Sequence, residues 1–276
     1  MNTALKPGTQ LTERYRIIQE IGRGDFGIVY QACDLNGDEP DQQVAIKQMP
    51  MQMIVDCERQ ADIRENLVHR NIPRITDYFS FEESSFLVGD FIPGSNLETI
   101  LKNQAGYLPT IKVILWAIQL CEVLDYLHTH PLHPIIFRDM KPSNIMLDPM
   151  DKVLLVDFGL ARPYPAGFFE TELPEYKHLK KGLAMGTAGY SPPEQYEGNV
   201  NPVSDIYALG ASLHHLLTLR DPRQEKPFTF QDYPVRSLNP GVPQGLDDVV
   251  MQATQNDPYN RFKSAAEMLS ALERLV

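Results

Sequence analysis

The chain has 276 residues, 43% of them hydrophobic, so it can bury the core of one large domain or two small lobes, and disorder is disfavoured. Its formal net charge of −11 argues against nucleic acid or an anionic membrane as a partner, because both favour clustered Lys and Arg. Cys33, Cys57 and Cys121 lie far apart without CxxC spacing. The sequence therefore predicts neither a disulfide framework nor a thiolate metal site, and a reducing cytoplasm fits.

The first residues, "MNTALKPGTQ", lack the apolar core of a signal peptide. The longest apolar block, "VILWAI" from Val113, is too short to span a bilayer. We therefore expect no membrane segment in this chain.

The sequence pattern changes along the chain. Short β-branched and aromatic runs dominate from Tyr15 to about Phe91, and long helical patterns dominate after Leu97. Pro93 and Gly94 between them suit a connector. We predict an α+β fold with a sheet lobe at 11–92, a helical lobe at 93–276 and an N-terminal extension at 1–10.

Three glycines, Gly22, Gly24 and Gly27, occur in "EIGRGDFGIVYQA", where backbone amides can approach phosphates without a Cβ in the way. A dinucleotide-binding fold would continue into a helix, but residues 28–32 alternate as a strand does. The glycines are therefore predicted to form a hairpin lid. The strand-like "VAIK" ends at Lys47, whose ammonium could reach phosphates under such a lid.

The segment 111–130, "IKVILWAIQLCEVLDYLHTH", carries apolar residues near helical spacing and predicts a buried helix. Its expected apolar positions are Ile111, Leu115, Ile118, Leu124 and Leu127.

The stretch "FRDMKPSN" combines groups that suit phosphoryl transfer, which depends on positioning, charge neutralisation and a proton acceptor. Asp139 can accept the proton. Lys141, two positions later in an extended loop, points the same way and can neutralise a transferring phosphate. Asn144 offers a neutral oxygen to a hard cation, and Asp157, at the end of a strand-like run, is a natural Mg²⁺ ligand.

These motifs together resemble a Hanks-type serine/threonine protein kinase of the bacterial branch, from about Leu11 to the C-terminus. "GRGDFGIV" resembles the glycine-rich loop, "VAIK" the ATP-binding strand, and "FRDMKPSN" the catalytic loop. "DFG" resembles the metal-binding segment, and "GTAGYSPPE" resembles the end of the activation segment.

The resemblance implies a two-lobed kinase fold and transfer of the γ-phosphoryl of ATP to Ser or Thr hydroxyls of proteins, with Mg²⁺ or alternatively Mn²⁺. Asp139, Lys141 and Lys47 would be catalytic, and Asn144 and Asp157 would bind metal. The residues implied to bind ATP are Ile21, Gly22, Gly24, Gly27, Val29, Ala45, Lys47, Gly89, Asp90, Ile92 and Met146.

The resemblance also implies structural and regulatory positions. Asp205 in "SDIYALG" would brace the catalytic loop, and Arg261 in "DPYNRF" would pair with Glu194. Lys141 after the catalytic Asp, together with Thr187 before the "PPE" turn, would suit Ser or Thr acceptors better than Tyr.

Two other functions stay open at this level. One is a barely active, ATP-binding pseudokinase that docks partners. The other is a small-molecule phosphotransferase, which would not need the peptide-shaping "GTAGYSPPE".

Two departures from the family pattern concern the catalytic loop and the activation segment. Phe137 replaces the more frequent His, and we expect its ring to pack without functional loss. Arg138 often holds an activating phosphate in this family, but before the terminal "GT" the only Ser or Thr in the segment from Asp157 is Thr171. We expect no phosphorylation switch close to Thr187, with Thr171 an unusual site and Glu170, Glu172 or Glu175 as permanent anions.

Gly89 stands where kinases carry the gatekeeper side chain. An open cavity that admits bulky N6-substituted ATP analogues is one expectation. The alternative is that Met146 or another apolar side chain fills the gap.

Gln60 stands where active kinases carry the Glu that pairs with the strand lysine, here Lys47. Arg64 occupies an apolar spine position one turn later. We expect a slow kinase that Gln60→Glu accelerates with little change in stability, on the premise of a hydrated cleft. The alternatives are that Gln60 faces solvent, or that Glu58 or Glu65 replaces it.

Overall fold

The computed structural model describes residues 4–24, 27–37, 42–65, 67–131, 134–164 and 186–276. Within 54–65, the side chains of Ile54, Asp56, Cys57, Arg64 and Glu65 are not described. The chain forms two compact units, Met1–Pro93 and Gly94–Val276, which are described separately below.

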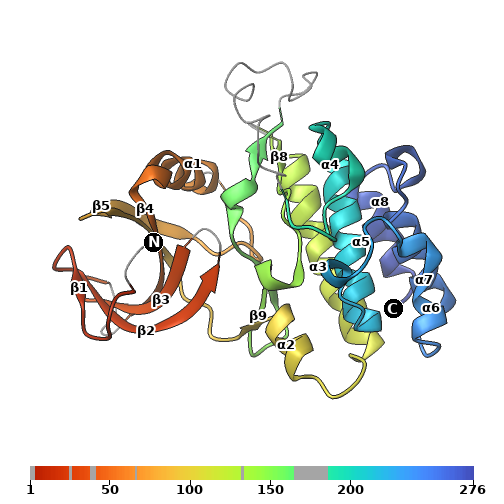
Figure 1. Ribbon diagram of the computed structural model, residues 1–276, viewed down its shortest axis with the longest axis horizontal. Coiled ribbons are helices and arrows are strands. Elements are labelled where there is room, and N and C mark those ends of the chain that lie inside the picture. Colours follow the sequence, from red (N-terminus) through yellow and green to blue (C-terminus); the bar gives the residue numbers. More distant parts are fainter. Residues whose placement is uncertain (1–3, 25–26, 38–41, 66, 132–133, 165–185) are drawn as a thin grey trace. The chain divides into compact units, whose positions relative to one another are not determined.

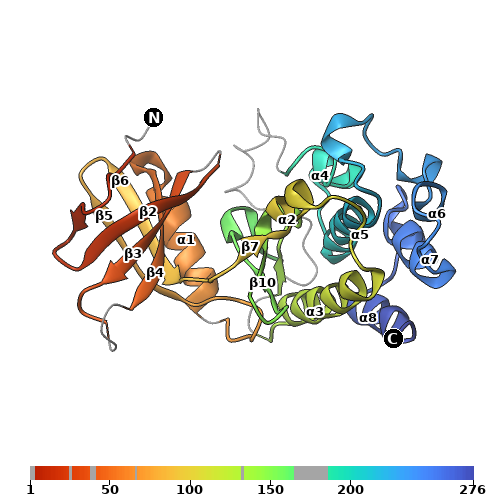
Figure 2. The same cartoon turned by 90° about the horizontal axis from the view of Figure 1, so that it is seen from below.

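The first unit is a six-stranded antiparallel sheet with the order β1-β2-β3-β4-β6-β5 (Figure 1). Helix α1 (Ile54–Glu65) lies against the sheet (Figure 2) and follows the short 3₁₀ turn η1 (Met51–Met53). The strands are β1 (Gln10–Leu11), β2 (Tyr15–Gly24), β3 (Gly27–Asp34), β4 (Gln43–Pro50), β5 (Ile75–Phe81) and β6 (Ser84–Asp90).

Alternation along β4 gives the sheet two faces. Val44 and Ile46 are buried in a core with Tyr15, Tyr30 and Phe86, whereas Ala45 and Lys47 point to the other face and are half-buried. The period-2 pattern of "QVAIKQMP" therefore determines that Lys47 lies on the face opposite this core.

The second unit is mainly helical, and its long helices α3 and α5 are labelled in Figures 1 and 2. The helices are α2 (Leu97–Asn103), α3 (Thr110–His128), α4 (Pro193–Glu197), α5 (Pro202–Thr218), α6 (Val235–Leu238), α7 (Gln244–Ala253) and α8 (Ala265–Glu273). Short strands form two small sheets, β10-β9-β7 and β11-β8. These are β7 (Ser95–Asn96), β8 (Ile135–Ile136), β9 (Ile145–Leu147), β10 (Val153–Leu155) and β11 (Arg162–Pro163).

The predicted helix at 111–130 is present as α3, but part of its expected apolar stripe is wrong. Ile111 and Leu115 are 49% and 44% exposed. The buried face instead includes Val113, Trp116 and Leu120. Apolar residues lie almost all round this helix, so periodicity alone does not select the buried face.

None of the described helices is long and apolar enough to cross a membrane. Cys33 and Cys121 are both buried.

Candidate active site

The catalytic-loop backbone is held by a buried carboxylate from α5. Asp205 is fully buried and accepts hydrogen bonds from the amides of Phe137 (2.8 Å) and Arg138 (2.7 Å). Its Oδ2 also bonds His128 Nε2 at 2.8 Å. Arg138 has a left-handed φ of 71°, an uncommon conformation for a non-glycine residue, and these bonds stabilise it.

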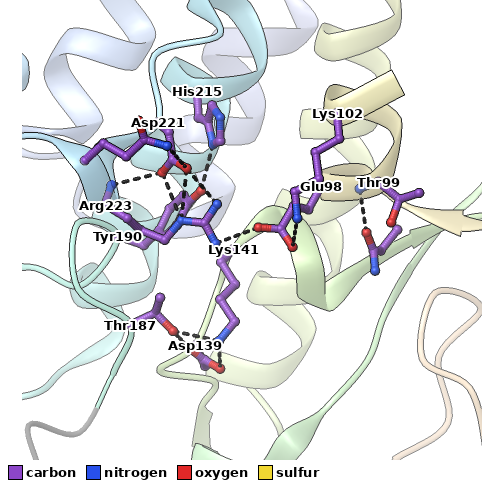
Figure 3. Close-up of polar contacts among 12 residues, drawn as sticks. Glu98, Thr99, Lys102, Asp139, Lys141, Thr187, Tyr190, His215, Asp221 and Arg223 are labelled. Carbon is purple, nitrogen blue, oxygen red and sulfur yellow. Dashed lines mark hydrogen bonds and ion pairs between the residues drawn. The ribbon is translucent and has the colours of Figure 1, made fainter. Parts of the chain in front are cut away.

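Asp139 is the point at which three donors converge (Figure 3 shows two of them). Its Oδ1 accepts from Thr187 Oγ1 at 2.7 Å, and its Oδ2 lies 2.8 Å from Lys141 Nζ. Asn144 Nδ2 also donates to Oδ2, at 2.8 Å. Lys141 Nζ in turn donates to Thr187 Oγ1 at 2.6 Å, which closes a triangle around the carboxylate.

The described geometry leaves oxygen atoms that suit a divalent cation. Because Asn144 uses its amide nitrogen to bond Asp139, its Oδ1 points elsewhere and can serve a metal. The Val156 amide donates to the Asn144 carbonyl at 2.9 Å, so the strand that leads to Asp157 is attached to the same loop. No group of three or more His, Cys, Asp or Glu in the described residues could hold a metal. One carboxylate and one amide oxygen fit Mg²⁺, which usually takes its other ligands from phosphates and water.

Phe137 packs as expected for an aromatic ring at its position. It is fully buried and meets Phe158 edge to face, with ring centroids 5.1 Å apart at 78°. Phe158 follows Asp157, which has a left-handed φ of 61° and accepts a bond from the Gly159 amide at 3.3 Å. The ring contact therefore links the catalytic loop to the "DFG" segment.

A buried ion pair ties α4 to the C-terminal part of the unit. Arg261, 1% exposed, binds Glu194 through two bonds of 2.6 and 2.9 Å. The guanidinium also donates to the backbone carbonyls of Gln255, Asn256 and Val203. The "PPE" turn before α5 thus has a fixed anchor.

In the first unit, Lys47 pairs in register with Val29 of β3 and Leu87 of β6, and Ala45 pairs with Gly89. Among the three lid glycines, Gly24 has open space where a Cβ would stand, and a Cβ at Gly22 would make only an ordinary contact with Val29 Cβ at 4.0 Å. Gly27 is different, because its φ is +148° and a Cβ would overlap the Gln48 carbonyl oxygen. The sheet itself therefore requires this glycine.

Gly89 does not border empty space on the side where a Cβ would point. That Cβ would lie 2.6 Å from the Arg74 carbonyl oxygen and 3.2 Å from Ile75 Cδ1. Within the first unit, the space next to Gly89 is thus taken by the Arg74 backbone and by the apolar side chain of Ile75. Asp90 follows, and its amide donates to the same Arg74 carbonyl at 3.0 Å.

Gln60 lies on the buried side of α1 with 2% exposure, so the alternative in which it faces solvent is wrong. The premise that this side chain sits in a hydrated cleft is wrong for the same reason. Its neighbour Ala61 packs on Met49 and Leu87. Glu58 is exposed, whereas the side chains of Arg64 and Glu65 lie outside the described residues.

The other predicted positions are located as follows. Ile21 of β2 is 45% exposed, Ile92 is half-buried after β6, and Met146 is half-buried in β9 of the second unit. Thr171, with Glu170, Glu172 and Glu175, lies outside the described residues.

Sequence reasoning missed two groups. His128 bonds Asp205 across 77 positions, and no local pattern signals that contact. Arg223 joins Glu98, Asp221 and Tyr190 (Figure 3). The clustered charges of "LRDPR" could have indicated the group around Arg223 from the sequence.

Known proteins with similar sequences include bacterial serine/threonine-protein kinases. The probable serine/threonine-protein kinase PknB of Lactococcus lactis is 34% identical over 278 residues, which cover 95% of this chain and 42% of that protein. Serine/threonine-protein kinase PrkC of Bacillus subtilis is 29% identical, over 95% of this chain and 40% of its own. This chain thus spans about two fifths of these relatives.

The fold is that of a solved kinase. The crystal structure of the Mycobacterium tuberculosis PknI kinase domain superposes with a TM-score of 0.73 at 21% identity, covering 99% of this chain and 100% of that one. The protein kinase domain family matches residues 15–269. On this match, and with the loop geometry described above, the chain belongs to the protein kinase domain family.

Proposed function

We propose that this chain transfers the γ-phosphoryl group of ATP to Ser and Thr hydroxyls of proteins. The triangle of Asp139, Lys141 and Thr187 is the observation that carries this proposal. A carboxylate, an ammonium and a hydroxyl within 2.6 to 2.8 Å of one another can hold an acceptor hydroxyl, take its proton and neutralise phosphate charge.

Each residue has one task in this proposal. Asp139 accepts the proton of the substrate hydroxyl, and Lys141 donates to the γ-phosphate oxygens as negative charge develops. Asn144 and Asp157 hold a divalent cation, which supplies charge neutralisation at the phosphates when bound. By family resemblance, Lys47 holds the α- and β-phosphates and the hairpin around Gly22 covers them.

The first test is transfer of radiolabelled γ-phosphate to a generic basic protein, with Mg²⁺ and then Mn²⁺ as the metal. Asp139→Asn removes the proton acceptor and keeps the shape, so we expect at least a hundredfold loss. ATP binding with equal, near-zero transfer in both proteins would contradict the proposal and support a pseudokinase, for which Gln60 is the motivating residue.

A further inference from the structure

The hydroxyl of Thr187 is carried by a tight turn. The amides of Tyr190 and Ser191 both donate to the Thr187 carbonyl at 3.1 Å. Thr187 Oγ1 meanwhile bonds Asp139 and Lys141. A displacement of this turn would therefore move the hydroxyl relative to the carboxylate it contacts.

The turn rests directly on the loop that follows α5. Gly189 has a φ of +87°, and a Cβ there would lie 2.5 Å from the Pro222 carbonyl oxygen and 2.8 Å from the Arg223 amide nitrogen. Tyr190, 2% exposed, bonds His215 Nδ1 through its hydroxyl at 2.7 Å. The turn and the loop are thus in backbone contact.

Two carboxylates fix the side chain of Arg223. Its Nε and Nη2 bind the Asp221 oxygens at 2.9 and 2.7 Å, and its Nη1 lies 2.6 Å from Glu98 Oε1. The guanidinium carbon lies 6.0 Å from the centre of the Tyr190 ring. Because Glu98 belongs to α2, the guanidinium joins α2, the loop and the turn (Figure 3).

The charges in this cluster support one another. The hydrogen bond to Asp221 raises the pKa of Arg223. Burial acts to raise the pKa of Glu98, but the bonds and charges of Arg223 and Lys102 lower it overall. Isolated exposed ion pairs contribute little to stability. A guanidinium that binds one carboxylate through two bonds and also pairs with a second is, however, held in a defined position.

We propose that Arg223 is a positioning residue for phosphoryl transfer. It holds the Pro222–Arg223 backbone against Gly189 and thereby holds the Thr187 hydroxyl against Asp139. The inference rests on the proposed function. It assigns to Arg223 an effect on turnover, without an effect on ATP binding.

The kinetic test compares Arg223→Gln and Arg223→Lys with Lys102→Gln. Lys102 is a matched control, because it also pairs with Glu98, at 3.4 Å, but is 68% exposed and belongs to α2 itself. We expect Arg223→Gln to lower kcat roughly tenfold with an unchanged KM for ATP. Arg223→Lys keeps the charge without the planar fork and should recover part of kcat. Lys102→Gln should match the wild type.

A double-mutant cycle separates positioning from general destabilisation. In a Thr187→Val background the hydroxyl is absent, so Arg223→Gln should lower kcat no further. In a Thr187→Ser background the hydroxyl is retained and the loss should reappear. Equal losses in the wild-type, Val and Ser backgrounds would overturn the proposal, because Arg223 would then act without Thr187.

Amide hydrogen exchange gives a readout that does not need activity. The amides of Tyr190 and Ser191 should lose protection in Arg223→Gln and keep it in Lys102→Gln. If the wild type is active while Arg223→Gln changes neither kcat nor this protection, the inference is wrong. If the wild type transfers no more phosphate than Asp139→Asn, the proposed function fails, and the exchange data still decide whether Arg223 holds the turn.

Discussion

The buried histidine His214 should make the fold less stable in mild acid. Its ring is fully buried in α5, its Nε2 bonds the Tyr233 carbonyl at 2.8 Å, and it packs edge to face on Phe230. Burial is the main reason that its pKa is lowered from 6.5 to about 4, and the nearby positive Arg220 adds to this. The imidazole ring of His214 is therefore neutral in the folded state at neutral pH.

The direction and size of this change in stability with pH follow from the linkage between proton binding and folding. Between the folded pKa of about 4 and the unfolded value of 6.5, only the unfolded chain binds this proton, so stability falls as pH falls through that window and is constant below it. Across the whole window, His214 lowers the free energy of unfolding by about 3 kcal/mol. About 2 kcal/mol of this is lost between pH 7 and pH 5.

The measurement is urea unfolding of the wild type and of His214→Asn at pH 7 and at pH 5. The substitution lowers stability at both pH values, but the drop between them should be about 2 kcal/mol smaller than in the wild type. His215, whose pKa burial also lowers, is present in both proteins and cancels. An equal drop in the two proteins would refute the assignment to His214.

Three other perturbations test the fold and the proposed site. Arg261→Gln leaves Glu194 buried without its partner and should cost about 3 to 5 kcal/mol in urea unfolding; a loss under about 1 kcal/mol would show that water reaches the carboxylate. Gln60→Glu should raise kcat/KM roughly five- to thirtyfold if it pairs with Lys47, while burial of the new charge costs about 1 to 3 kcal/mol of stability; an unchanged or lower kcat/KM would count against this pair. Gly89→Ala should destabilise by about 1 to 3 kcal/mol because its Cβ meets the Arg74 carbonyl oxygen, and N6-benzyl-ATP should bind the wild type more weakly than ATP does; tight N6-benzyl-ATP binding would restore the open-pocket expectation.

Local motifs predicted the elements that a short stretch of sequence determines. The period-2 run that ends at Lys47 is a strand, the glycines at 22 and 24 belong to a hairpin, and Asp139 meets Lys141 within one extended loop. In each case the chemistry and the geometry depend on neighbours only a few positions away.

Contacts between segments that are distant in the chain could not be predicted from the sequence. The space next to Gly89 is taken by Arg74 and Ile75, which lie fifteen and fourteen positions earlier, so a missing side chain did not mean an open space. Arg223 acquires its contacts from α2 and from the turn at Gly189, which meet only in the folded unit. The exposure of Ile111 depends on which side of an apolar helix finds a partner, and periodicity cannot supply that information.

The measurement that tests the central claim most directly is a competition among three peptides that differ only in a Ser, Thr or Tyr acceptor. The chain is incubated with ATP and Mg²⁺, and mass spectrometry locates and counts the phosphate. We predict phosphate on the Ser and Thr peptides, little on the Tyr peptide, and none above background with Asp139→Asn. Equal phosphate in wild type and Asp139→Asn, or a preference for the Tyr peptide, would contradict the account.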